Sequence, residues 1–226
     1  MIEEPAPWSY ASRAIELMRS ASAVINQGTG GGERLLELRE YRPGKVVATE
    51  DHPPKLRLAT ERLTPSAAQV VEVRLTYDDP MPFVDAEFDL VLNRHAAFNA
   101  NEVARVLAPG GTFLTQQIHG LWAHDLLALF GAQPQWPEAT LDNCLPQLVS
   151  AGLRIVDTRE WAGRSSFVDV GAIVYYLRAV PWPVPGFSVE TYSKPLLGLQ
   201  HRLEGGDGLS FAAGKYLIEA RKALPS

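Results

Sequence analysis

The stretch that decides the fold is Val24-Ile25-Asn26-Gln27-Gly28-Thr29-Gly30-Gly31-Gly32-Glu33. Its apolar, β-branched start leads into a run of glycines, which predicts a buried strand that turns directly into a helix beginning at Glu33. Glycines in such a turn let bare backbone approach a ligand, and the N–H groups at the start of the following helix favour negative charge. The segment therefore predicts a ligand-binding loop at the carboxyl end of a strand.

The spacing of these glycines separates two kinds of nucleotide-binding loop. A dinucleotide fingerprint, G-x-G-x-x-G/A, needs a small third residue at position 33, where this chain has Glu33. A carboxylate at that position would repel a pyrophosphate. A nicotinamide-dependent oxidoreductase is therefore disfavoured.

Short β-branched runs alternate with helical patterns along the whole chain, which predicts an α/β fold with a mostly parallel sheet. The expected strands are Ala23–Ile25, Lys45–Thr49, Gln69–Leu75, Phe88–Leu92, Thr112–Thr115, Leu153–Thr158 and Leu209–Ala220. The expected helices are Ser9–Ser20, Glu33–Leu38, Pro53–Leu63, Asn99–Leu107, Leu121–Phe130, Leu141–Ala151, Asp169–Ala179 and Thr191–Leu203. A helix fits the alanine content of Leu209–Ala220 as well as a strand does.

Three more motifs follow the glycine loop. Glu50 comes directly after the second strand, Met81-Pro82-Phe83 precedes the strand Phe88–Leu92, and Glu102–Phe113 contains Arg-Val-Leu-Ala-Pro-Gly-Gly. In this order and at these separations, the four motifs over residues 23–117 resemble class I S-adenosylmethionine (SAM)-dependent methyltransferases. The resemblance is to the broad group that contains the ubiquinone- and menaquinone-biosynthesis methyltransferases.

The resemblance implies a Rossmann-like, seven-stranded, mostly parallel sheet with helices on both faces and an antiparallel last strand at residues 209–221. It implies a single domain over residues 1–226, with a SAM-binding core at about 20–120 and a substrate-shaping part at about 121–208. The cofactor-binding residues implied in this way are Asn26, Gly28, Thr29, Gly30, Gly32, Glu50, Asp51, Tyr77, Asp78, Asn93 and Arg94.

Particular contacts follow from the same resemblance. Glu50 would accept hydrogen bonds from both ribose hydroxyls, a charge-assisted arrangement. Whether Tyr77, Asp78 or Asp79 meets the adenine is left open. Asn26 stands where these families usually have the Asp or Glu that receives the methionine ammonium. Gln27 stands where these families usually have an apolar residue.

Asn93-Arg94-His95 follows the fourth strand, at the carboxyl edge where open α/β sheets bind ligands. His95 is the candidate catalytic base, since an imidazole near neutral pKa can take a proton from a hydroxyl or amine acceptor. The alternative is that His95 caps the helix at Asn99 or bonds to a neighbour. Arg94 is equally compatible with a substrate carboxylate and with a structural ion pair. Gln116, Gln117 and His119 are expected to form a polar pocket wall.

Composition narrows the function classes. The formal net charge of −5 and the lack of a basic cluster argue against a nucleic-acid partner. Cys144 is the single cysteine, which rules out an intramolecular disulfide and a cysteine-based metal site, and no metal-ligand spacing occurs. No signal peptide or membrane-spanning run is visible, so the expected location is the cytoplasm.

The leading hypothesis is therefore SAM-dependent methyl transfer to an O, N or C atom of a small molecule. Asn26 supports an alternative, in which a protein with the methyltransferase fold has weakened or lost methyl transfer. In that case SAM would be a structural ligand, or the protein would catalyse another reaction or serve as an interaction module.

Overall fold

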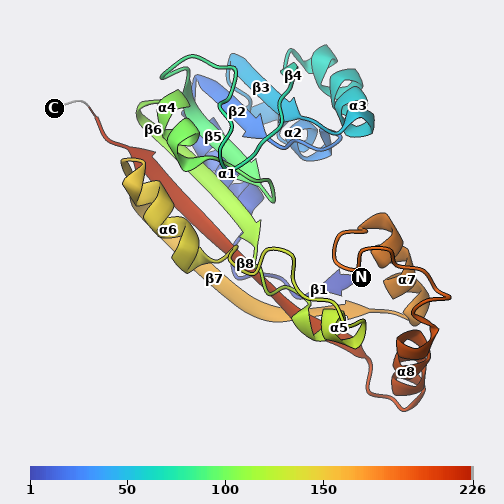
Figure 1. The fold of residues 1–226 in the computed structure, drawn as a ribbon. Coiled ribbons are helices and arrows are strands. Elements are labelled where there is room, and N and C mark those ends of the chain that lie inside the picture. The colour runs from blue at the N-terminus through green and yellow to red at the C-terminus, as the bar shows by residue number, and fades with distance from the viewer. Residues whose placement is uncertain (225–226) are drawn as a thin grey trace. The chain divides into compact units, whose positions relative to one another are not determined.

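The computed structural model describes residues 1–224, which form one eight-stranded sheet with the order β1-β7-β8-β6-β5-β2-β3-β4 (Figure 1). The strands are β1 (Ile2–Glu3), β2 (Ala23–Gln27), β3 (Lys45–Glu50), β4 (Gln69–Glu72), β5 (Phe88–Arg94), β6 (Leu107–Ile118), β7 (Leu153–Phe167) and β8 (Leu209–Lys222). Adjacent strands from β4 to β6 pair in parallel, with Ile25 opposite both Val47 and Val91.

The last strand runs against its neighbours. The His119 N–H donates to the Gly214 carbonyl, and the Ala123 N–H donates to the Ala212 carbonyl. From the first of these hydrogen bonds to the second, the donor number rises from 119 to 123 while the acceptor number falls from 214 to 212. The strand β8 is therefore antiparallel to the chain that leaves β6. The prediction of a strand at Leu209–Ala220 is confirmed, and the Rossmann-like α/β class is confirmed with it.

Helices connect the strands and begin at recognisable caps. They are α1 (Tyr10–Met18), α2 (Glu33–Glu37), α3 (Pro53–Leu63), α4 (Ala100–Val106), α5 (His124–Leu129), α6 (Leu141–Ser150), α7 (Val170–Ala179) and α8 (Ser193–Glu204), with short 3-10 turns at Arg39–Tyr41 and Thr64–Ser66. The side chains of Ser9, Asn99 and Asp169 accept hydrogen bonds from backbone N–H groups at the starts of α1, α4 and α7. The helix that follows β5 is thus capped by Asn99 itself and not by His95.

The predicted count of seven strands is wrong by one. Ile2–Glu3 forms β1, which pairs antiparallel with Ser165 and Ser166 near the end of β7. That pairing is possible because β7 continues to Phe167, far beyond the predicted end at Thr158. A two-residue strand held by backbone hydrogen bonds leaves no hydrophobic period in the sequence, so the pattern could not reveal it.

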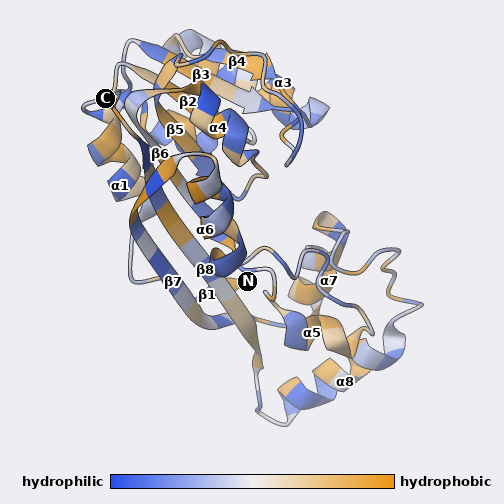
Figure 2. Cartoon of the chain, turned by 60° about the vertical axis from the view of Figure 1, so that its left-hand side comes forward, coloured by the Kyte–Doolittle hydropathy of each residue, from blue (hydrophilic) through white to orange (hydrophobic). Residues whose placement is uncertain are grey.

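The chain divides into two compact units. The larger unit comprises Ser9–Gln117, Asp142–Arg159 and the chain from Leu217 onward, and the smaller unit comprises Met1–Trp8, Ile118–Leu141 and Glu160–Tyr216. In the smaller unit, α5, α7 and α8 pack around buried residues that include Leu126, Ile173 and Phe211. The strongly hydrophobic sequence of α7 stands out in Figure 2. Among the described residues, no helix has both the length and the apolar character needed to cross a membrane.

In the larger unit, an ion pair ties α1 to β8. The Arg13 guanidinium donates to both carboxylate oxygens of Glu219, at 2.7 and 2.8 Å. Glu219 is 2% exposed, whereas the Arg13 side chain is 40% exposed. The buried carboxylate is therefore paired with a cation that reaches it from the surface.

We expect Arg13→Met to lower the free energy of unfolding by about 3 kcal/mol, because it leaves the buried Glu219 charge without its partner. This loss in free energy of unfolding is at the low end of the range for broken buried ion pairs, because solvent can reach the position that the Arg13 guanidinium leaves. The double variant Arg13→Met/Glu219→Met should recover much of the loss. Urea unfolding of the three proteins checks this, and equal stability of wild type and Arg13→Met would contradict it.

Candidate cofactor and active site

The glycine loop follows β2 and needs glycine for two separate reasons. Gly28 has φ +62°, and a Cβ placed there would lie 2.5 Å from the Cβ of Ala96, in the loop after β5. Gly30 has φ +63°, but an added Cβ would meet no atom within 4 Å. Gly28 is thus required for close packing, whereas Gly30 presents bare backbone to open space.

Glu50, at the end of β3, holds this loop in place. One carboxylate oxygen accepts from the Gly30 N–H at 2.8 Å, and the other accepts from the N–H groups of Asp51 and His52, at 3.2 and 3.0 Å. Glu50 is only 8% exposed, so these three donors stabilise a largely desolvated charge. The carboxylate predicted to meet a ribose is therefore also a structural anchor of the loop.

Thr49 and Thr29 add a second link between β3 and the loop. The Thr29 N–H donates to the Thr49 carbonyl at 2.8 Å, and the Gly28 N–H donates to the Thr49 hydroxyl at 3.3 Å. The Thr29 hydroxyl is buried and has no hydrogen-bond partner among the described residues. A buried hydroxyl without a partner is costly in a folded protein and indicates a position that a ligand or water would occupy.

A buried polar layer lies where β2, β5 and β6 end. The Asn93 amide donates to Gln27 at 3.0 Å and its oxygen accepts from Thr115 and Gln117, at 3.2 and 2.8 Å. The Gln27 amide in turn donates to the sulfur of Met81 at 3.2 Å. Gln27, Asn93 and Thr115 are at most 1% exposed, so this network fixes the strand ends relative to one another.

Arg94 and His95 continue β5 to the edge of the sheet. His95 is exposed and has φ +61°, a left-handed conformation that costs a non-glycine residue free energy and is concentrated at functional sites. Its N–H donates to the Gln116 carbonyl at 2.9 Å, and its Nε2 lies 3.2 Å from the Gln116 amide nitrogen. Gln116 thus holds the imidazole from the neighbouring strand.

Tyr10 lies near Arg94 at the end of β5, a proximity that the sequence did not indicate. Its hydroxyl is buried without a hydrogen-bond partner among the described residues, and it feels the charge of Arg94. Burial raises the pKa of Tyr10 above its ordinary value, although the Arg94 charge acts in the opposite direction. Only the fold brings the start of α1 to the end of β5, so no local pattern could reveal this proximity.

The third and fourth sequence motifs, Met81-Pro82-Phe83 and Glu102–Phe113, meet through a salt-bridged clamp. Arg105 of α4 donates to the carbonyls of Met81 and Phe83 and pairs with Glu102, which accepts from the Met81 N–H at 2.6 Å. The hydrogen bonds from Arg105, opposed in part by burial, lower the pKa of Glu102. The clamp fixes the segment Met81-Pro82-Phe83, in which the Met81 sulfur accepts from Gln27 of the buried polar layer.

Of the remaining predicted cofactor residues, Gly32 is buried at the start of α2, and the others are at least partly exposed. Asp51 is exposed beside Glu50, and Tyr77 (56% exposed) and Asp78 lie in the chain that follows β4. The N–H groups of Asp78 and Asp79 donate to the Thr76 hydroxyl, which shapes that turn. Asn26 is partly exposed at the end of β2.

Cys144, the single cysteine of the chain, is buried. Burial raises the pKa of the Cys144 thiol to about 12, which makes it unreactive near neutral pH. No group of three or more His, Cys, Asp or Glu side chains there could hold a metal ion.

Comparison with known proteins agrees with this geometry. Residues 25–115 match the family model described as a methyltransferase domain. Over this segment the chain is similar to methyltransferase domains. Over 114 residues, the chain is 32% identical to a demethylmenaquinone methyltransferase of Thermus thermophilus, an alignment that covers 46% of this chain and 50% of that protein. The chain thus spans about half the length of the curated relatives it matches.

Solved structures extend the likeness of the methyltransferase domain to the whole fold. A Bacillus subtilis protein superposes with a TM-score of 0.65 at 18% identity, covering 96% of this chain and 99% of that one. An SAM-dependent methyltransferase of Mesorhizobium loti gives a TM-score of 0.55 at 14% identity, covering 95% and 98%. At these identities the likeness establishes the fold alone.

We expect Glu50→Gln to lower the free energy of unfolding by about 1–3 kcal/mol even without ligand. Glutamine offers one oxygen to three N–H donors and turns its own amide hydrogens toward one of them. Asp51→Asn is the matched control, since this exposed neighbour should change stability by less than about 0.5 kcal/mol. Chemical denaturation of both variants measures the difference, and similar losses would mean that Glu50 does not anchor the loop.

Proposed function

We propose that this protein transfers a methyl group from SAM to an O, N or C atom of a small-molecule acceptor. The observation that carries the proposal is the buried Glu50 carboxylate bonded to the glycine loop, at the carboxyl edge of a methyltransferase domain. SAM is the proposed cofactor and the cytoplasm the proposed location. A nucleic-acid partner is not part of the proposal, because the net charge of −5 does not favour one.

The residues present fit the cofactor. The unpartnered Thr29 hydroxyl and the open space at Gly30 leave room and hydrogen-bonding capacity beside Glu50. In the proposal, Asn26 receives the methionine ammonium, Glu50 receives the ribose, and Tyr77 or Asp78 lies beside the adenine. The other proposed cofactor contacts come from Gly28, Thr29, Gly30, Gly32, Asp51, Asn93 and Arg94.

Glu50 has little unused capacity for the ribose. A carboxylate offers about four lone-pair positions, and Gly30, Asp51 and His52 already donate into this one. One ribose hydroxyl can be accepted without change, whereas accepting both displaces one of those backbone bonds. The bond from Gly30 is the one we assign to this exchange, since Gly30 lies in the loop that would touch the cofactor.

SAM, when bound, supplies an activated methyl group. Methyl transfer is an in-line displacement, so the protein contributes mainly by holding the acceptor in line. His95 stands exposed at the end of β5, and its Nε2 accepts from the Gln116 amide, which makes Nε2 the basic nitrogen. In the proposal, Nε2 exchanges this hydrogen bond for the proton that an O–H or N–H acceptor loses. Arg94 beside it supplies positive charge for an anionic group of either ligand.

A thermal-shift comparison of SAM, S-adenosylhomocysteine and NAD tests the cofactor. A ligand present at 100 times its dissociation constant adds about 2.7 kcal/mol of stability, which such a measurement resolves. The proposal expects a shift with both sulfur compounds and none with NAD. Stabilisation by NAD alone, or by none of the three at millimolar concentration, would overturn it.

We expect Asn26→Asp to tighten SAM binding several-fold. Hydrogen bonds in which one group is charged contribute about 1.5–3 kcal/mol against about 0.5–1.5 for neutral pairs, and a pair of opposite charges adds attraction. A gain of about 1 kcal/mol corresponds to that several-fold change. Calorimetric titration of both proteins at one salt concentration decides it. Weaker binding by the aspartate variant would mean that the pocket is built around the amide.

We expect His95→Asn to lower turnover of a hydroxyl or amine acceptor by about 100-fold or more, with SAM affinity unchanged. Asparagine is chosen because the left-handed backbone at position 95 costs asparagine less free energy than it costs alanine. Formation of S-adenosylhomocysteine, measured across a panel of such acceptors, gives the turnover. Normal turnover by the variant would assign His95 a structural role.

A further inference from the structure

The strand β7 has an open edge over most of its length. Its neighbour on one side is β8, and on the other side the described residues provide only the two-residue β1. Because β1 pairs with Ser165 and Ser166, residues 153–163 have no strand beside them on that side in the described part of the chain. Unpaired backbone groups along such an edge can accept a further strand. This edge contains none of the residues proposed to bind SAM, so a partner bound there would not depend on methyl transfer.

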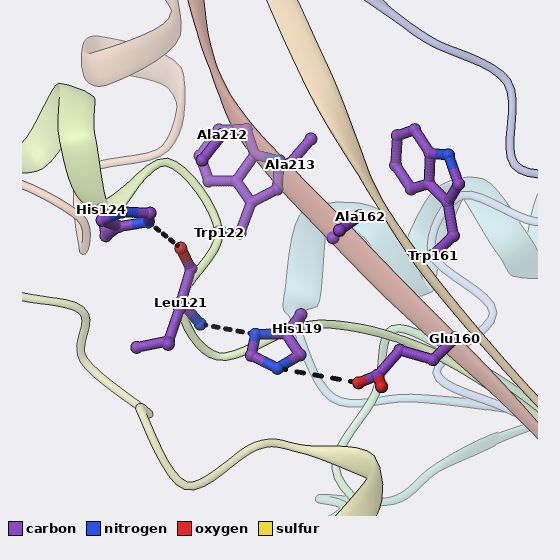
Figure 3. A pocket seen from close by; sticks show the side chains of 10 residues that line it. His119, Leu121, Trp122, His124, Glu160, Trp161, Ala162, Ala212 and Ala213 are labelled. Atoms are coloured by element: carbon purple, nitrogen blue, oxygen red, sulfur yellow. Dashed lines mark hydrogen bonds and ion pairs between the residues drawn. The ribbon is translucent and has the colours of Figure 1, made fainter.

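Hydrogen bonds near the end of β7 show which residues direct their backbone groups to the open edge. The Glu4 N–H donates to the Arg164 carbonyl at 3.0 Å, and the Arg164 N–H donates to the Glu4 carboxylate at 3.0 Å. Toward β8, which runs beside β7 in Figure 3, the Trp161 carbonyl oxygen lies 3.5 Å from the position of a Cβ added at Gly214. These directions alternate along a strand, so Thr158, like Arg164, turns its N–H and its carbonyl to the open edge.

Two charges of opposite sign flank Thr158. Asp157 and Arg159 lie on the same face of β7 and form an ion pair, with Arg159 Nε 2.8 Å from a carboxylate oxygen of Asp157. Both side chains are open to solvent, at 39% for Asp157 and 51% for Arg159, and Thr158 is exposed as well. Charges on an edge strand discourage pairing where the approaching strand brings like charges opposite them.

A second copy of β7 that runs antiparallel brings opposite charges instead. In a pair centred on Thr158, the two Thr158 residues exchange N–H···O bonds, and each residue before Thr158 faces the residue equally far after it in the other copy. Asp157 of each copy therefore faces Arg159 of the other, in a non-hydrogen-bonded pair, where side chains lie closest. Pairing centred on Asp157 or on Arg159 would put like charges opposite each other, so the charges select the register centred on Thr158.

We propose that two copies of this protein associate through their β7 edges, in an antiparallel pair centred on Thr158 with Asp157 of each copy facing Arg159 of the other. Such an interface is isologous, since the same residues serve both copies, and all three residues belong to the larger unit. One strand from each copy makes a small interface, so the dimer is weak. Salt weakens it further, because the paired charges are exposed and therefore screened.

Charge reversal tests the register. Asp157→Arg makes all the facing charges positive and Arg159→Asp makes them all negative, so each variant alone should dimerise about tenfold or more weakly than the wild type. The double variant Asp157→Arg/Arg159→Asp restores the alternation and should dimerise as the wild type does. An equimolar mixture of the two single variants should form a heterodimer, because every positive residue then faces a negative one. Sedimentation velocity at low salt, over a range of protein concentrations, measures the association.

Arg57→Asp is the matched control, since it makes the same change in net charge as Arg159→Asp at an exposed residue of α3 and should leave dimerisation unchanged. The ion pair lost in the single variants is exposed and contributes little to stability, so every variant should stay folded, which circular dichroism checks. A wild type that is monomeric at millimolar concentration, single variants that dimerise as the wild type does, or a mixture or double variant that stays monomeric would each overturn the proposal.

Discussion

The site depends on one buried charge and the three backbone N–H groups that satisfy it. Glu50 ends β3, whereas Gly30 belongs to the loop after β2, so their hydrogen bond joins two neighbouring strands exactly where ligands bind in this fold. Glycine provides no side chain with which to hold the loop, and the restraint therefore has to come from elsewhere. A carboxylate meets this need because one oxygen anchors the loop while the other closes the turn at Asp51 and His52.

Beneath this anchor, the amide layer explains one of the two departures at the end of β2. Gln27 is buried and bonds Asn93 and Met81, so an apolar residue at position 27 would leave the Asn93 amide without its acceptor. Its neighbour Asn26 is partly exposed. Successive residues of a strand point to opposite faces, so two adjacent amides serve different purposes. Gln27 belongs to the internal structure, whereas Asn26 is the departure that enters the cofactor proposal.

Much of the fold could be predicted because its signals are local. The glycine loop, the motif ending in Pro109-Gly110-Gly111, and the β-branched runs indicate a strand, a helix or a turn within a few residues. The ends of the long strands could not be predicted in this way. β7 continues through polar residues to Phe167, where pairing with β1 and β8 decides the conformation, and backbone pairing leaves no trace in side-chain periodicity.

The same limit applies to the sites. Glu50 was indicated by its place after a strand, but its role as an anchor depends on a loop distant in sequence, and the Tyr10 hydroxyl meets the end of β5 only after folding. In the smaller unit, His119 was expected in a polar wall, yet its partner Glu160 lies in a stretch that the sequence pattern left outside any strand. The direction of each hydrogen bond determines whether these side chains can donate to or accept from another group. The Leu121 N–H donates to His119 Nδ1, which leaves Nε2 of His119 as a hydrogen-bond donor. The backbone N–H groups around Glu50 occupy most of the acceptor positions of its carboxylate. Residue type alone encodes neither of these constraints.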